Sequence, residues 1–425
     1  MWQEMPAQSH SARADAAPLL DVAGEASDAD AAAPAPGGAA GAGAAGDGKA
    51  QHNFLFGGRT IGWFGSVALL YGNITGPGMV QIPGLFQSAG WLLPTLLFVL
   101  FAYLAGVVSL YLARAISLLP GNRRLTQRVE FAEIARATLP KWAFVLTLAL
   151  IVFNLLASNT SAVVVSAQTM DAMLLALFKH TCGVYVWPLR APACVSSKPP
   201  GENSAFGGDY VISLGWGVVM AITIPLGLLN LDDNIWVQIC GMLALTATIV
   251  VWAVQFVFYS GLQLARTPVF NGAGAAGALS TIAFNYGLIL TVPSWLSEKA
   301  PGVRASRNIW IALSFGTAQF LVLGLLGAWA LDLNQGDDIL AVLTDDATPH
   351  ILALSKAGAF VLPLAALITG IPIYSIIIRY NLLQMGFHII PANIFAVGLP
   401  WALSLVLFAG NQVRFAARRG ASLCD

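Results

Sequence analysis

A Gly-Pro-Gly triplet, Gly76 to Gly78, stands in the middle of an apolar stretch, and Pro83 and Gly84 follow it. Proline removes a backbone donor and glycine is flexible, so these residues interrupt a helix. The N–H groups at such a break can bind an anion, and the carbonyl groups can bind a cation. Glycine also allows close packing between membrane helices, which leaves a purely structural alternative.

A second interrupted segment runs from Ser280 to Gly287, and Pro293 follows it. Broken helices at corresponding places in two halves of a chain indicate the central site of a transporter. A zwitterion carries one carboxylate and one ammonium group, so it matches both kinds of backbone group. The two segments therefore suggest a site for a small zwitterion.

The composition indicates the elements that must position these segments. Of the 425 residues, 57% are hydrophobic and 10% are charged, against roughly 45–50% and about 25% in soluble domains. Apolar stretches of about 20 residues, long enough to cross a bilayer as helices, recur along the chain. We expect nine spans, at 60–87, 91–118, 141–177, 210–229, 234–262, 279–297, 307–331, 351–384 and 391–411.

The charged residues predict the orientation. With a cytosolic N-terminus, the inner flanks of the spans hold eleven Lys and Arg residues and the outer connections hold five. This agrees with the positive-inside bias. We expect a multi-pass protein of the plasma membrane or of a vacuolar or lysosomal membrane.

Three domains follow from the pattern. Residues 1–56 hold seven acids and two bases around an Ala/Gly-rich run, which is typical of a disordered tail. Residues 57–411 form the transmembrane domain. Residues 412–425 are atypical, because three arginines there would lie on the outer side.

Few side chains in the spans are ionisable. Asp171 lies near the outer end of the third span and Glu298 at the inner end of the sixth, and we expect solvent to reach both. Cys182 and Cys194 fall in one outer connection, where a disulfide is an open alternative to free thiols. No cluster suits metal binding or nucleophilic catalysis, so we expect no enzyme and no cofactor.

Three stretches carry a family resemblance: GNITGPGMVQIPGLFQSAGWLLP, VEFAEIARATLP and IAFNYGLILTVPSWLSEKAPGV. Together they resemble the amino acid/auxin permease family of the amino acid–polyamine–organocation superfamily. The resemblance implies an all-α polytopic membrane protein with a five-plus-five inverted repeat, interrupted helices 1 and 6, and eleven helices. Against that pattern the chain looks truncated after helix 9. The implied activity is amino acid transport by alternating access.

The resemblance also implies roles for individual residues. Gly76 and Gly78 match glycines whose amides bind a substrate carboxylate, although Pro77 between them has no N–H group. The other residues assigned to substrate binding in the two breaks are Thr75, Met79, Ala283, Phe284, Asn285 and Tyr286. Where many members carry a Glu after the second break, this chain has Ser294, which argues against a carboxylate proton relay at that position.

A sodium site like that of sodium-coupled members would use Gly72, Thr75, Thr369 and Ser375. The coupling ion, sodium or a proton, stays open. Helix 3 adds Asn154, Ser158 and Ser161 on one face. That face either lines the cavity, where Asn154 and Ser158 would contact substrate, or bonds a neighbouring helix.

The leading prediction is therefore secondary active transport of an amino acid across a lipid bilayer, with no nucleic-acid partner. The alternative is a transport-incompetent truncated isoform or an amino-acid sensor of the same fold. The sequence does not identify protein partners.

Overall fold

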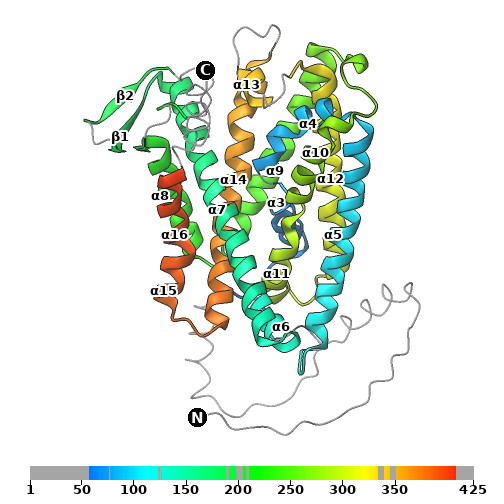
Figure 1. The fold of residues 1–425 in the computed structure, drawn as a ribbon, viewed down its shortest axis with the longest axis vertical. Coiled ribbons are helices and arrows are strands. Elements are labelled where there is room, and N and C mark those ends of the chain that lie inside the picture. Colours follow the sequence, from blue (N-terminus) through cyan, green and yellow to red (C-terminus); the bar gives the residue numbers. More distant parts are fainter. Residues whose placement is uncertain are drawn as a thin grey trace, which may run out of the picture.

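The computed structural model describes residues 57–75, 77–122, 125, 127–187, 191–197, 204–206, 210–333, 339–344 and 351–407. The predicted tails 1–56 and 412–425, and Gly76, lie outside these residues. The described chain is a bundle of long helices with a small sheet at one end (Figure 1). We call this end the sheet end, and the opposite end, where α6 (Phe131–Thr138) lies, the α6 end (Figure 1).

The first predicted break is present. α3 (Trp63–Gly72) ends before the Gly-Pro-Gly triplet, and the 3-10 helix η1 (Pro77–Gln81) leads directly into α4 (Ile82–Ala89). Pro83 stands in the first turn of α4, where its missing N–H removes no helical hydrogen bond.

The second break has the same construction. α10 (Ala275–Asn285) is followed by the 3-10 helix η5 (Gly287–Thr291) and then by α11 (Val292–Glu298), again with proline in the first turn. The break begins later than expected, because Ala283, Phe284 and Asn285 are still α-helical. The last carbonyls of a helix have no intrahelical partner, so a residue can offer its carbonyl group here without unwinding.

Each of the nine expected spans corresponds to a helical segment. Among the described residues, seven stretches are long and apolar enough to cross a membrane, and α3 and α8 (Leu214–Leu228) are shorter apolar helices. The long stretches are α5 (Leu92–Leu118), α7 (Lys141–Phe178), α9 (Ile235–Val254) continued by the π-helix η2 (Gln255–Ser260), η4 (Gly272–Gly274) with α10 and α11, α12 (Ala305–Ala330), α14 (Ala353–Gln384), and α15 (Ile389–Asn393) with η6 (Ile394–Gly398) and α16 (Leu399–Leu407). Two short helices, η3 (Leu264–Arg266) and α13 (Ile339–Thr344), lie in the connections.

The sheet settles the cysteine alternatives. It has the order β2-β1-β3, with β1 (Thr181–Trp187) antiparallel to both β2 (Ala193–Val195) and β3 (Tyr210–Ser213). Cys182 and Cys194 are opposite each other in the β1–β2 register and form a disulfide. The disulfide therefore fixes the short strand β2 to β1.

The packing places α14 inside the bundle and α5 at its surface. α14 packs against α7, α8 and α9, and it is the most buried of the seven long stretches. α5 instead exposes large apolar side chains, including Leu96, Val99 and Tyr103. Such a surface is stable only in an apolar solvent, which is what a lipid-facing helix requires.

The expectation for Asp171 and Glu298 is wrong, because both side chains are fully buried. Asp171 accepts hydrogen bonds from the Thr181 hydroxyl, at 2.8 Å, and from the Gly215 N–H group, at 2.9 Å. It thereby joins α7 to β1 and to the first turn of α8. The sequence shows near which end of a span each residue lies, but it could not show which other segments cover these two side chains.

Candidate functional site

The two breaks meet where Gly78 lies against Asn285. A Cβ atom placed on Gly78 would be 3.1 Å from Asn285 Oδ1 and 3.2 Å from Nδ2. A side chain here would press on the amide, so glycine allows η1 to approach the end of α10. Two residues predicted from separate motifs are thus neighbours in the fold.

The backbone at this junction offers groups of both polarities. η1 begins at Pro77, so the N–H groups of Gly78 and Met79 belong to the first turn, which has no intrahelical acceptors. Pro77 contributes no donor, as expected. The end of α10, where the last carbonyl groups form the negative end of a helix, packs against η1. A carboxylate and an ammonium group could therefore be bound side by side.

Asn285 adds a side-chain acceptor. It is buried, and its Nδ2 atom donates to the Thr281 carbonyl at 3.1 Å. Its Oδ1 atom is also buried and has no hydrogen-bond partner among the described residues. Buried polar atoms are normally paired, so this oxygen is available to a ligand donor.

The neighbours of Asn285 differ in their surroundings. Ala283 and Phe284 are exposed at the end of α10, with Phe284 at 53%. Tyr286 is buried, and its hydroxyl donates to the Phe98 carbonyl at 3.0 Å and contacts the Thr317 hydroxyl at 2.7 Å. Tyr286 therefore packs the end of α10 against α5 and α12, where its hydroxyl group is bound.

The predicted polar face of helix 3 is not packed against the bundle. Asn154 and Ser161 on α7 are exposed and Ser158 is half-buried. Sequence reasoning missed Asn159, which is fully buried and donates from Nδ2 to Ser375 Oγ at 2.9 Å. The signal was present, because Leu155, Asn159, Ala162 and Ser166 form a buried stripe at helical spacing.

The side chains of the predicted sodium site have other partners in the structure. Thr369 contacts α9, where a Cβ atom on Gly241 would be 2.4 Å from its methyl group, whereas Ser375 receives the bond from Asn159. The hydroxyl groups of Thr75, Thr369 and Ser375 each donate to a carbonyl of their own helical segment. Among the described residues there is also no cluster of three or more His, Cys, Asp or Glu side chains that could hold a metal ion.

Gln238 lies where the sodium site was expected. It is buried on α9, and its Nε2 atom donates to the Thr369 carbonyl at 2.9 Å. Its Oε1 atom would be 2.7 Å from a Cβ atom on Gly72. The amide of Gln238 thus bridges α14 and α3. The sequence did not indicate this contact, because a single polar residue in an apolar helix does not identify its partners.

A hydrogen bond also links the two breaks. Thr291 at the end of η5 donates from Oγ1 to Asn73 Oδ1 at 2.8 Å. Asn73 in turn donates from Nδ2 to the Leu69 carbonyl of α3 at 2.8 Å. The α6-end halves of the two interrupted helices are therefore joined next to the site.

These features define a class of protein: a polytopic helical membrane protein with two interrupted helices that meet at a polar junction, as in secondary transporters. A family model described as transmembrane amino acid transporter protein matches residues 59–396. The chain belongs to this family, as the resemblance predicted. A search of curated proteins finds no match to the chain.

Membership of this family supports amino acid transport in general, with an amino acid as the small-molecule substrate and a lipid environment. It is a family of transporters, not of enzymes. The multi-pass integral membrane architecture agrees with this assignment.

Proposed function

We propose that this chain carries an amino acid across the membrane by alternating access, driven by an ion gradient. The observation that carries the proposal is the contact between Gly78, in the first turn of η1, and Asn285, the last residue of α10. The substrate carboxylate would bind at the start of η1. The ammonium group would bind at the end of α10 and at Asn285 Oδ1.

The proposed architecture is a five-plus-five inverted repeat with a cytosolic N-terminus. The parallel construction of the two breaks, each with a five-residue 3-10 helix and a proline in the next helical turn, supports an internal repeat. Three bases predicted for the cytosolic side, Arg128, Lys299 and Arg379, belong to segments next to Glu298, at one end of the bundle. In this orientation the α6 end faces the cytosol.

The test is uptake of radiolabelled amino acids into proteoliposomes, with sodium and proton gradients imposed separately. Gly78→Val should abolish uptake, because its side chain would displace Asn285. Gly302→Val is the matched control, because a Cβ atom there would have no atom within 4 Å, and it should transport normally. Normal uptake by Gly78→Val would refute the site. Binding without uptake by the native chain would favour an amino-acid sensor.

A further inference from the structure

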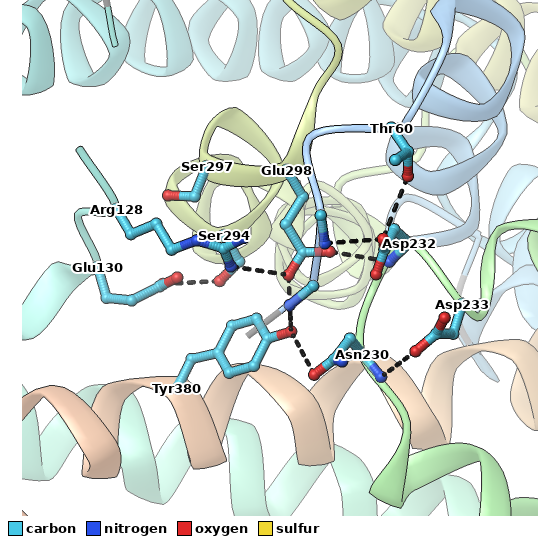
Figure 2. A network of polar contacts seen from close by, with 12 residues as sticks. Thr60, Arg128, Glu130, Asn230, Asp232, Asp233, Ser294, Ser297, Glu298 and Tyr380 are labelled. Carbon is cyan, nitrogen blue, oxygen red and sulfur yellow. Dashed lines mark hydrogen bonds and ion pairs between the residues drawn. The ribbon is translucent and has the colours of Figure 1, made fainter. Parts of the chain in front are cut away.

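A cluster of polar residues at the α6 end is not explained by the substrate site (Figure 2). We call it the polar cluster, and it joins four segments of the chain. These are the segment before α6, the loop after α8, the helix α11 and the end of α14. Its members are Arg128, Glu130, Asp232, Ser294, Glu298 and Tyr380.

Glu298 is the centre of the polar cluster. Tyr380 donates from its hydroxyl to Oε1 at 2.6 Å, and the Asp232 N–H group donates to Oε2 at 2.8 Å. Arg128 Nη1 lies 3.8 Å from Oε1. An arginine and two hydrogen-bond donors therefore offset part of the cost of burying this carboxylate.

Residues 57–61 lie across the same place. The Gly58 N–H group donates to Asp232 Oδ2 at 2.8 Å, and the Ile61 N–H group donates to the Glu298 carbonyl at 3.2 Å. A Cβ atom on Gly57 would be 2.4 Å from Glu298 Oε2. The chain is thus packed directly on the carboxylate, and this end cannot open unless these contacts change.

Glu130 is buried beside it with a weaker set of partners. The Ser294 hydroxyl donates to Glu130 Oε2 at 2.6 Å (Figure 2). Ser294 lies in the first turn of α11, so a carboxylate from the segment before α6 reaches this helix. The backbone holds it there, because the Glu130 N–H group donates to Gln384 Oε1 at 3.0 Å and the Ala132 N–H group donates to Asn381 Oδ1 at 3.0 Å.

The charges around Glu130 disfavour its ionised form. Among the described residues, the charged groups that face it are Arg128 on its own segment, Glu133 on α6 and Glu298 on α11, while α14 contributes the neutral Asn381 and Gln384. Within the part of the chain that the structure describes, two buried carboxylates thus share Arg128, and burying a charge without full compensation is costly. Burial, reinforced by Glu298 and Glu133, raises the pKa of Glu130 to about 8, although Ser294 and Arg128 act in the opposite direction.

We propose that Glu130 is a proton-binding site, which holds a proton while the α6 end is closed and releases it to cytosolic water when that end opens. The step is a simple dissociation, in which the O–H bond of the carboxylic acid breaks and water accepts the proton. The inference rests on the proposed transport function, because it assigns the opening to the transport cycle.

The direction of the pH dependence follows from linkage. Exposure to water on opening would return the pKa of Glu130 towards its ordinary value of 4.5. The closed state then binds more protons than the open state between about pH 4.5 and 8, so acid on the cytosolic side favours closure. Each unit of acidification in this window shifts the equilibrium towards the closed state by up to tenfold.

The first experiment measures proton binding without transport. Thermal unfolding of the purified protein in detergent is followed from pH 5 to pH 8 for the native chain and for Glu130→Gln. The native chain releases the Glu130 proton when it unfolds, whereas Glu130→Gln has no such proton. The unfolding constant of the native chain, relative to that of Glu130→Gln, should therefore rise by up to tenfold for each unit of increase in pH. Asp332→Asn, a matching change at an exposed carboxylate after α12, should follow the native chain. A difference that does not vary with pH overturns the proposal.

The second experiment tests the link to transport. Amino acid exchange in proteoliposomes is measured at equal pH on both sides, so that no proton gradient contributes. Exchange by the native chain and by Asp332→Asn should rise towards pH 8, exchange by Glu130→Gln should be independent of pH, and Glu130→Asp should restore the dependence. An unchanged profile in Glu130→Gln overturns the link. If the native chain exchanges no amino acid, the transport function fails, while the unfolding experiment still decides the proton site.

Discussion

Replacement of Arg379 should destabilise the protein more than that of any exposed base. Arg379 is buried on α14, and its Nη1 atom donates to the carbonyls of Leu228, at 2.7 Å, and Gly227, at 3.3 Å. Its Nη2 atom donates to the Leu229 carbonyl. The last carbonyls of α8 have no helical partners, so the guanidinium group satisfies the end of that helix and interacts favourably with its dipole.

The magnitude follows from these contacts. Hydrogen bonds to a charged group contribute about 1.5–3 kcal/mol each. Replacing Arg379 also removes the cost of burying its charge, which offsets several kcal/mol of the lost stability. Arg379→Gln can satisfy one carbonyl and leaves the others buried, so we expect a net loss of about 3–5 kcal/mol. For a chain of this length that corresponds to a fall of roughly 5 °C in Tm. Arg379→Lys keeps the charge but cannot reach three acceptors with a planar group, so its loss should be about half as large.

The assay is thermal unfolding in detergent, with Arg307→Gln as the control, because Arg307 is an exposed base on α12. The control should unfold within about 1 °C of the native chain, since isolated surface charges contribute about 0–1 kcal/mol. If Arg379→Gln also unfolds within that interval, Arg379 does not stabilise the end of α8. If Arg379→Lys is no better than Arg379→Gln, the charge itself contributes nothing.

Two further variants test the sheet and the junction. Replacing Cys182 and Cys194 together by Ser removes a link across 12 residues, which contributes about 3 kcal/mol, so the β1 amides should exchange hydrogen faster while the helices are unchanged. Protection of β1 at the native level would show that the strands pair without the disulfide. Thr291→Val leaves Asn73 Oδ1 without its donor at a cost of about 1–3 kcal/mol, so it should lower both Tm and the uptake rate. Thr138→Val, at an exposed hydroxyl on α6, should change neither.

The elements could be predicted from the sequence because a bilayer imposes simple requirements. A helix that crosses it needs about 20 apolar residues, so the spans follow from composition, and proline and glycine reveal the breaks. Gly78 and Asn285 were assigned from two motifs, and each motif lies at the end of a helical segment. Their contact follows once both helices are interrupted at the same depth.

Long-range contacts could not be predicted in this way. Glu298 was expected to be solvated because it ends a span, but Tyr380 and the Asp232 backbone, from distant segments, bury it. The spacing of Asn154 and Ser161 showed that they share a face, but not which face of α7 packs. Gln238 gave no signal at all, because one polar residue in an apolar helix does not indicate its partner.

Hydrogen bonds join the halves of the two interrupted helices in two pairs, and each pair contains one half of each helix. α3 is joined to α11, by Thr291 and Asn73 near the junction and by backbone bonds of Ile61 to Glu298 and Ala300 at the α6 end. α4 is joined to α10 at the sheet end, where the Asn271 N–H group donates to the Ala89 carbonyl and a Cβ atom on Gly274 would be 2.5 Å from Ser88.

A movement that preserves these bonds must carry each pair as a unit. The two pairs are connected in sequence through η1 and η5, so such a movement would be absorbed at the breaks, where Gly78 and Asn285 meet. A ligand bound across that contact therefore interacts with both pairs, and this is how its binding could influence which end of the protein is open.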